Sequence, residues 1–214
     1  MYKAVLFDLD GTLTDTLADI AAAMNHALQA HGLPTWPEAD YRYLVGDGAK
    51  TLALRCVRER TDLADSVRQA YQAQYEAHQL DRTAPYAGIP AMLSALAEQG
   101  LILTVLSNKP DADTKRIVQH FFPDVPFALV RGQVEGVPVK PDPAGALAVA
   151  RAVGVPPEEF LYLGDTAVDM RCALAAGMHP VGALWGFRTR EELLESGARW
   201  LASSPDDLQK ITLM

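Results

Sequence analysis

The hydrophobic positions of this chain follow two patterns. Short continuous apolar runs are typical of buried strands, whereas apolar residues that recur every three or four positions are typical of helices. The apolar runs predict strands at residues 4–7, 101–106, 127–130, 160–163, 179–184 and 200–201. The helical spacing, ended by glycine or proline, predicts helices at residues 16–31, 89–98, 111–122, 143–153, 166–176 and 191–196. Residues 38–79 also keep helical spacing, with no strand pattern among them.

This order of elements predicts an α/β fold with a doubly wound parallel sheet, because strands and helices alternate. Right-handed crossovers bring the carboxyl ends of the strands to one edge, where ligands bind in such sheets. The helical stretch after the first strand is too long for a simple crossover. We therefore expect a discontinuous α/β core domain, residues 1–15 and 84–214, with an inserted α-helical cap domain, residues 16–83, over the binding edge.

Composition and charge narrow the class of protein. Of the 214 residues, 49% are hydrophobic and 21% are charged, as in soluble globular proteins, which excludes a disordered or fibrous chain. The net charge of −8 argues against a nucleic-acid or membrane partner. No apolar run approaches the roughly 20 residues that span a membrane, and the N-terminal segment lacks a signal-peptide pattern, so we expect a cytoplasmic protein. The two cysteines, Cys56 and Cys172, are typical of reduced core residues.

Four polar clusters lie at predicted strand ends or in loops at the same edge of the sheet. They are residues 8–13, 107–109, 140–141 and 164–169. Asp8, Asp10, Asp165 and Asp169 would gather negative charge there, with Lys140 as the opposing charge. Two like charges at ~4 Å repel by about 4 kcal/mol at an effective dielectric constant near 20, so such a cluster favours a bound cation. All-oxygen ligands favour a hard ion, and Mg²⁺ is the predicted cofactor.

A phosphate group suits the other polar residues of these clusters. Lys140, Ser107, Thr12 and the backbone N–H groups of the glycine turn can receive a phosphate beside the cation. A carboxylate next to a bound phosphoryl group is a candidate nucleophile, and a second carboxylate two positions away can act as general acid and base. Each cluster alone also fits an ordinary turn or helix cap, but their joint occurrence at one edge favours a site.

These motifs resemble those of the haloacid dehalogenase superfamily, in the phosphatase branch with a helical cap after the first strand. The match consists of the DLDGTL segment at residues 8–13, Ser107-Asn108, Lys140-Pro141 and the GDTAVD segment at residues 164–169. The resemblance implies that Asp8 is the nucleophile and Asp10 the general acid and base. It also implies a metal site of Asp8, the Asp10 carbonyl, Asp165 and, directly or through water, Asp169, and a phosphoryl site of Thr12, Ser107, Asn108 and Lys140.

The predicted cap contains one further candidate segment. Gly46 and Gly48 precede a predicted helix and allow a close backbone approach to a ligand, although an ordinary turn is the alternative. Residues 43–55 are similar to the cap segment of bacterial phosphoglycolate phosphatases. This similarity implies that Lys50 or Arg55 meets a substrate carboxylate, with Lys50 the better candidate.

The sequence therefore predicts a Mg²⁺-dependent phosphatase for a small phosphorylated substrate, with 2-phosphoglycolate as the leading candidate. The alternatives are a related phosphatase for pyrophosphate, a nucleotide or a sugar phosphate, and a sugar phosphomutase of the same fold. A non-catalytic binding module is disfavoured, because it would have no chemical need for both Asp8 and Asp10. The sequence carries no signal for the oligomeric state.

Overall fold

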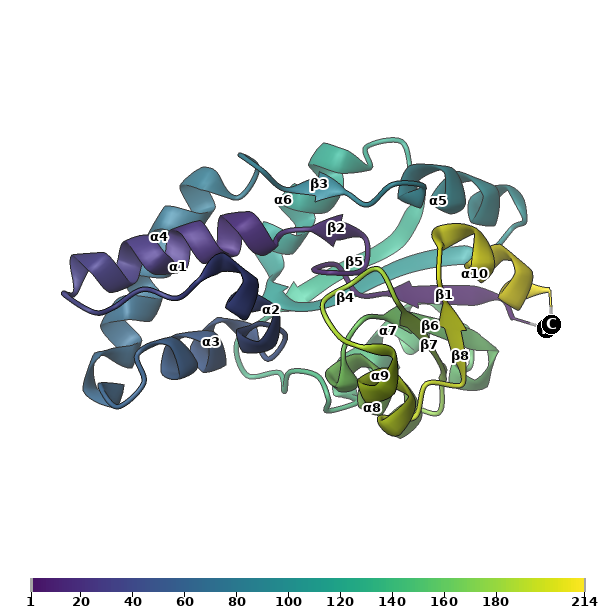
Figure 1. Cartoon of the computed structure of the whole chain (residues 1–214). Coiled ribbons are helices and arrows are strands. Elements are labelled where there is room, and N and C mark those ends of the chain that lie inside the picture. Colours follow the sequence, from purple (N-terminus) through teal and green to yellow (C-terminus); the bar gives the residue numbers. More distant parts are fainter. Residues whose placement is uncertain (1, 214) are drawn as a thin grey trace.

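The core of the molecule is a six-stranded parallel sheet, seen in a computed structural model that describes residues 2–213. The strands lie in the order β5-β4-β1-β6-β7-β8, so the chain winds outward from β1 in both directions (Figure 1). Their bounds are β1 Ala4–Phe7, β4 Ile102–Pro110, β5 Phe127–Gln133, β6 Phe160–Gly164, β7 His179–Ala183 and β8 Trp200–Ala202. The predicted α/β class with a doubly wound parallel sheet is confirmed.

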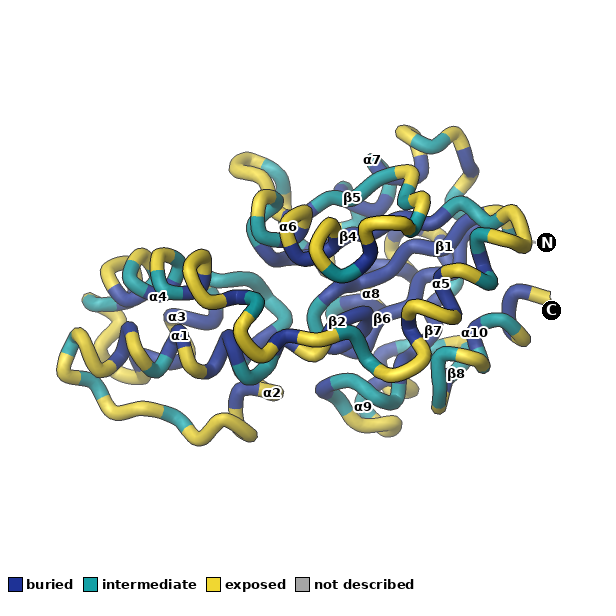
Figure 2. The backbone as a smooth tube through the Cα atoms, turned by 90° about the horizontal axis from the view of Figure 1, so that it is seen from above, coloured by how far each residue is buried: buried dark blue, intermediate teal, exposed yellow. Residues whose placement is uncertain are grey.

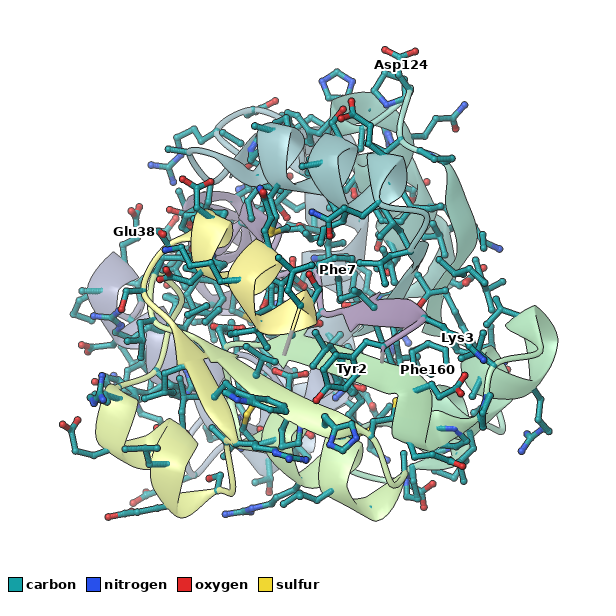
Figure 3. All side chains as sticks on the ribbon, turned by 90° about the vertical axis from the view of Figure 1, so that its right-hand side faces the viewer. Tyr2, Lys3, Phe7, Glu38, Asp124 and Phe160 are labelled. Atoms are coloured by element: carbon teal, nitrogen blue, oxygen red, sulfur yellow. The ribbon has the colours of Figure 1, made fainter. Side chains whose placement is uncertain are left out.

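Helices cover both faces of this sheet. On one face, α5 (Ile89–Glu98), α6 (Asp111–Phe121) and α10 (Pro205–Thr212) supply apolar side chains to one hydrophobic cluster. On the other face, α7 (Ala144–Val153) and α8 (Ala167–Ala175) supply a second cluster. The short helix α9 (Arg190–Glu195) contacts β7. The side-chain view along the sheet shows Phe7 in the interior, whereas Asp124 lies at the periphery (Figure 3).

The central strand β1 sets the position of the polar clusters. It pairs with β4 and β6 on its two sides, and Phe7 is opposite Val105 and Leu163. All four β1 residues are buried, because the sheet is covered on both faces. Asp8 therefore emerges between the ends of two neighbouring strands.

Between β1 and β4 the chain forms a helical insertion, by which we mean the helices that lie between β2 and β3. Its elements are α1 Leu17–Ala30, η1 Glu38–Asp40, α2 Tyr41–Leu44, α3 Gly48–Cys56, η2 Thr61–Leu63 and α4 Ala64–His78. The insertion has a hydrophobic cluster of its own, to which a single core residue, Phe187, is added. Its helices lie to one side of the sheet, and their buried stretches alternate with exposed ones (Figure 2).

Two short strands join the insertion to the core. β2 (Thr14–Asp15) and β3 (Ala84–Pro85) pair in an antiparallel ribbon, which two-residue strands are too short to reveal as a sequence pattern. The buried Asp19 of α1 accepts hydrogen bonds from the backbone N–H groups of Arg82 and Thr83 and from the Thr83 hydroxyl, at 2.8 to 3.1 Å. The two connections are therefore tied to each other and to the first helix of the insertion.

β5 runs to Gln133 rather than ending at residue 130, and two further elements of the core also differ from the sequence prediction. β4 does not end at residue 106 but runs on to Pro110, because a register irregularity after Leu106 lets Pro110 pair with Gln133 of β5. The C-terminal helix α10 was not predicted, although Ser204, Pro205 and Asp207 form a helix start with a capping box. Among the described residues, no helix is both long and apolar enough to cross a membrane.

Candidate active site

Three buried carboxylates meet at the carboxyl ends of β1 and β6. Asp8 follows β1, Asp165 follows β6, and Asp169 lies in the first turn of α8. One oxygen from each lies within 4.8 Å of the other two. The side chains of Asp8, Asp165 and Asp169 can thus face a single ion.

Lys140 inserts a positive charge into this cluster. Its Nζ donates hydrogen bonds to Asp8 Oδ1 and Asp169 Oδ1, both at 2.7 Å, and to the Leu106 carbonyl at 3.2 Å. The lysine side chain is 4% exposed, so these ion pairs are held away from water. One ammonium therefore faces three carboxylates and cannot neutralise them all.

Burial and neighbouring charges shift the pKa values of the groups in this cluster. Burial, with repulsion from Asp169 and Asp165, raises the pKa of Asp8 well above its ordinary value, although Lys140 opposes the shift. Burial, with repulsion from Asp169, raises the pKa of Asp165 to about 7. Burial lowers the pKa of Lys140, but attraction to Asp169 and Asp8 outweighs it and raises that pKa above its ordinary value. The arrangement thus favours a further cation or a retained proton.

Glycines let the backbone approach these carboxylates closely. A side chain at Gly11, whose φ is +82°, or at Gly186 would collide with Asp165. A side chain at Gly164 would collide with Asp169 in the same way. The spacing of glycine and aspartate in the first and fourth motifs is therefore a packing requirement as well as a chemical one.

Asp169 also caps a helix. Its Oδ2 accepts hydrogen bonds from the backbone N–H and the hydroxyl of Thr166, at 3.1 and 2.6 Å, and the Thr166 hydroxyl in turn accepts from the Asp169 N–H. This capping box fixes the side chain while its other oxygen holds Lys140. Asp169 thus caps α8 and belongs to the carboxylate cluster at the same time.

Asp10 lies beside the carboxylate cluster and has different partners. Its Oδ1 accepts a hydrogen bond from the Thr16 hydroxyl at 2.7 Å and lies 3.2 Å from Lys109 Nζ. The Asp10 side chain is outside the three-carboxylate group but lines the same pocket as Asp8. This separation keeps a second carboxylate close to Asp8 without adding its side chain to the candidate metal site.

The second motif lies in the extended part of β4. Ser107 lines the pocket, and its Oγ accepts a hydrogen bond from the Lys109 N–H at 3.2 Å. The Asn108 amide donates to the carbonyls of Gly46 and Lys140, both at 3.0 Å, and accepts from the Lys140 N–H at 2.8 Å. Asn108 thus joins the sheet to the lysine loop and to the helical insertion.

Thr12 is placed deeper than the sequence suggested. The residue is fully buried, and its hydroxyl donates to Asp165 Oδ1 at 3.1 Å. Its carbonyl accepts a hydrogen bond from the Trp185 indole at 2.9 Å, and Trp185 packs on the core. The Thr12 side chain is therefore not among those that line the pocket.

The helical insertion closes the pocket from the other side. Gly46 and Gly48 line it, and Gly48 adopts a φ of +84° that L side chains rarely adopt. Lys50 is exposed and does not line the pocket. Arg55 also lies outside it, because its guanidinium pairs with Asp47 at 2.7 Å. Neither cation favoured by the sequence thus reaches the pocket.

The pocket contains one cation to which the sequence analysis gave no role. Lys109 is buried against Asp10, and its Nζ donates to the Tyr75 hydroxyl at 2.8 Å. Tyr71 and Tyr75 stack on each other along α4 and also line the pocket. The sequence contained one indication of these pocket residues, because tyrosines at positions 71 and 75 share one helix face. A helix face of this kind is equally typical of core packing, so it does not identify a site.

Two arginines connect the insertion to the loop after β7. Arg42 of α2 donates to the Phe187 carbonyl at 3.0 Å, and Arg188 donates to the Val45 carbonyl at 2.9 Å. Both guanidinium groups lie near the Tyr43 ring, at 5.9 and 5.5 Å from its centre. These reciprocal contacts hold the insertion against the core at the rim of the pocket.

Comparison with known proteins places this fold and site in a class. The family of haloacid dehalogenase-like hydrolases matches residues 5–183, and the chain belongs to this family. It is 30% identical to a phosphoglycolate phosphatase of Mannheimia succiniciproducens, with 98% of each chain covered. It is also 32% identical to an N-acetylmuramic acid 6-phosphate phosphatase of Pseudomonas aeruginosa, with 86% of this chain and 83% of that protein covered.

Solved structures show the same similarity to phosphatases. A predicted phosphoglycolate phosphatase from Haemophilus somnus superimposes with a TM-score of 0.90 at 29% identity, covering 99% of this chain and 98% of that one. The family and the fold over nearly the whole chain are therefore shared with proteins described as phosphatases.

Proposed function

We propose that this protein hydrolyses a small phosphate monoester through a covalent intermediate on Asp8. The observation that supports this most strongly is the buried pairing of Asp8 with Lys140, next to two further carboxylates. A nucleophile for phosphorus must be ionised, and Lys140 offsets part of the cost of keeping a buried carboxylate charged.

The residues present fit a divalent cation. Asp8, Asp165 and Asp169 supply only oxygen ligands, and burial together with their mutual repulsion raises the pKa of Asp8 and of Asp165. We propose that Mg²⁺ is held by Asp8, Asp165 and the Asp10 carbonyl, with Asp169 supporting the site directly or through water. When bound, the ion would supply charge stabilisation to a phosphoryl group.

The chain's own residues can carry out the two steps. In the first, an Asp8 oxygen bonds to phosphorus while the bond from phosphorus to the leaving oxygen breaks, and Asp10 gives that oxygen a proton. In the second, Asp10 takes a proton from water, whose oxygen displaces the Asp8 carboxylate and releases phosphate. Ser107, Asn108 and Lys140 are proposed to hold the phosphoryl group. The Thr12 hydroxyl, expected to join them, donates to Asp165 instead and is proposed to position that carboxylate.

The helical insertion is proposed to act as a cap, residues 16–83, on a core of residues 1–15 and 84–214. Its Gly46 and Gly48 reach the pocket, while Asn108 and the two arginines hold it in place. The intermediate needs shielding while the alcohol leaves and then access for water. The β2–β3 ribbon is the natural hinge for that movement, because it is the covalent connection between the two parts.

We propose 2-phosphoglycolate as the substrate. The full-length similarity to a phosphoglycolate phosphatase supports this choice. A phosphatase for another small ester is the second candidate, because a relative of nearly equal identity acts on a sugar phosphate by its name. A sugar phosphomutase would use the same two carboxylates but return the phosphoryl group to sugar.

The test is phosphate release from 2-phosphoglycolate, beside pyrophosphate, a nucleotide and sugar phosphates, with and without EDTA. The Asp8→Asn variant is the blank, since it removes the nucleophile with little change in shape. We expect the highest kcat/KM with 2-phosphoglycolate, and no release with EDTA or the variant. A higher kcat/KM for another ester would identify that ester as the substrate in place of 2-phosphoglycolate. Isomerisation without phosphate release would identify a mutase.

A further inference from the structure

The pocket contains two buried ammonium groups, and the proposed mechanism uses one of them. Lys140 lies among Asp8, Asp169 and the Leu106 carbonyl, so each of its three N–H donors has an acceptor. Lys109 also lines the pocket, and the proposed mechanism gives it no role. Among the described residues, these are the two cationic side chains that line the pocket.

Among the residues that the structure describes, Lys109 has protein partners for two of its three N–H donors. The neighbours of its Nζ are the Tyr75 hydroxyl at 2.8 Å and Asp10 Oδ1 at 3.2 Å, which account for two of its three N–H groups. The side chain is 4% exposed, so the ammonium group lies in a place where water is scarce.

The position of Lys109 follows from the role of its neighbour. A general acid must lie within hydrogen-bond reach of the leaving oxygen, so Asp10 marks the side of the pocket where the alcohol departs. Lys109 Nζ is in direct contact with Asp10, whereas Lys140 is in contact with Asp8. A negative group one or two carbons from the leaving oxygen would therefore lie beside Lys109, while the phosphoryl group lies beside Lys140.

We propose that Lys109, oriented by Tyr75 of the helical insertion, is the specificity-determining residue that recognises a carboxylate on the alcohol part of the substrate. This inference rests on the proposed phosphatase function and deepens it. It replaces Lys50 and Arg55, which do not line the pocket, as the residue that selects an acidic substrate.

The experiment compares two esters of the same size. 2-Phosphoglycolate carries the carboxylate, and 2-hydroxyethyl phosphate has a neutral CH₂OH group in its place. Lys109→Met is expected to lower the ratio of their kcat/KM values about 10- to 100-fold, because a hydrogen bond between two charged groups is lost for one ester only. Lys109→Arg should restore part of the ratio, and Lys115→Met, at an exposed site on α6, should leave it unchanged.

A binding measurement separates recognition from catalysis. Calorimetric titration of both esters into Asp8→Asn and into Asp8→Asn/Lys109→Met should show the same selective loss for 2-phosphoglycolate. The inference is overturned if both esters lose affinity and kcat/KM by the same factor, since Lys109 would then act only by positioning Asp10. It is also overturned if Lys50→Met, rather than Lys109→Met, changes the ratio.

Failure of the proposed function would look different. If wild-type protein releases phosphate from no ester, the phosphatase proposal fails, and the calorimetric ratio still decides the role of Lys109. If wild-type protein hydrolyses and binds both esters without preferring the carboxylate, it remains a phosphatase and the Lys109 inference is wrong.

Discussion

At the scale of single residues, Asn108 makes contacts beyond the one that the family resemblance implied. The sequence motif implied a contact with the phosphoryl group, whereas the side chain makes three hydrogen bonds to the backbone at Gly46 and Lys140. Its amide therefore fixes the loop that presents Lys140, and it also anchors the helical insertion. The effect of Asn108 on phosphate binding is expected to pass largely through Lys140.

We expect Asn108→Ala to destabilise the protein by about 2–4 kcal/mol, since it leaves buried backbone groups without partners. The same change should lower kcat, because Lys140 is no longer held beside Asp8. Urea unfolding and steady-state kinetics measure the two effects. A variant of wild-type stability with only a raised KM would instead mean that Asn108 acts by direct contact with the substrate.

The carboxylate cluster also makes stability depend on pH. The pKa of Asp165 is raised from 3.8 to about 7 in the folded protein without metal. Between these values the unfolded chain releases the proton while the folded chain keeps it, so the free energy of unfolding falls as pH rises from about 4 to about 7. Asp165→Asn should flatten this slope, and Mg²⁺ should stabilise the wild type more near pH 7.5 than near pH 5.

Denaturant unfolding in EDTA across this pH range is the measurement. Asp165 also accepts a hydrogen bond from the Phe187 N–H, so the substitution can lower stability at every pH. The comparison is therefore between the slopes of the unfolding free energy with pH, and not between its absolute values. Equal slopes for wild type and Asp165→Asn would show that this carboxyl is not the source of the effect.

The sequence predicted which residues meet, but not everything that they contact. Asp8, Asp165 and Asp169 lie together because they follow strands or begin a helix at one edge of a parallel sheet, and the alternation of strands and helices predicts that edge. Lys140 joins them from the loop between β5 and α7. The sequence could not place Lys50 relative to the pocket, because the direction in which a helix of the insertion faces depends on its packing.

At the scale of elements, the buried strands were the most predictable part of the fold. Residues 4–7 and 160–163 form continuous apolar runs because both faces of the sheet are covered, and they match β1 and most of β6. β4 was predicted too short, since Ser107, Asn108 and Lys109 are polar yet continue the strand into the pocket. Local polarity there reflects the site rather than a turn.

The helix α10 has one leucine packed on the core and one that is exposed. Its Leu208 is fully buried against the core, whereas Leu213 at its C-cap is 80% exposed. We expect Leu208→Ala to lower the free energy of unfolding by about 2–5 kcal/mol. Leu213→Ala is the matched control and should change it by less than about 0.5 kcal/mol. Equal effects in thermal or urea unfolding would mean that α10 is not packed on the core in solution.

At the scale of the whole molecule, the sheet with its helices and the helical insertion have separate hydrophobic clusters. The candidate nucleophile, its lysine and the carboxylates come from the sheet, whereas the tyrosines and glycines opposite them come from the insertion. The sequence predicted this division from the uninterrupted helical pattern. It could not predict the contacts between the insertion and the core. In these contacts the side chains of Arg42, Arg188 and Asn108 donate to backbone carbonyls, and they depend on how the insertion packs against the core.

If Asp8 becomes phosphorylated during turnover, rapid acid quenching should trap the phosphorylated protein. Enzyme mixed with Mg²⁺ and ³²P-labelled 2-phosphoglycolate is quenched within milliseconds and digested. We expect a hydroxylamine-sensitive label on the peptide that contains Asp8, and none with Asp8→Asn. Steady release of phosphate without any labelled peptide, or undiminished turnover by Asp8→Asn, would contradict the proposed phosphorylation of Asp8.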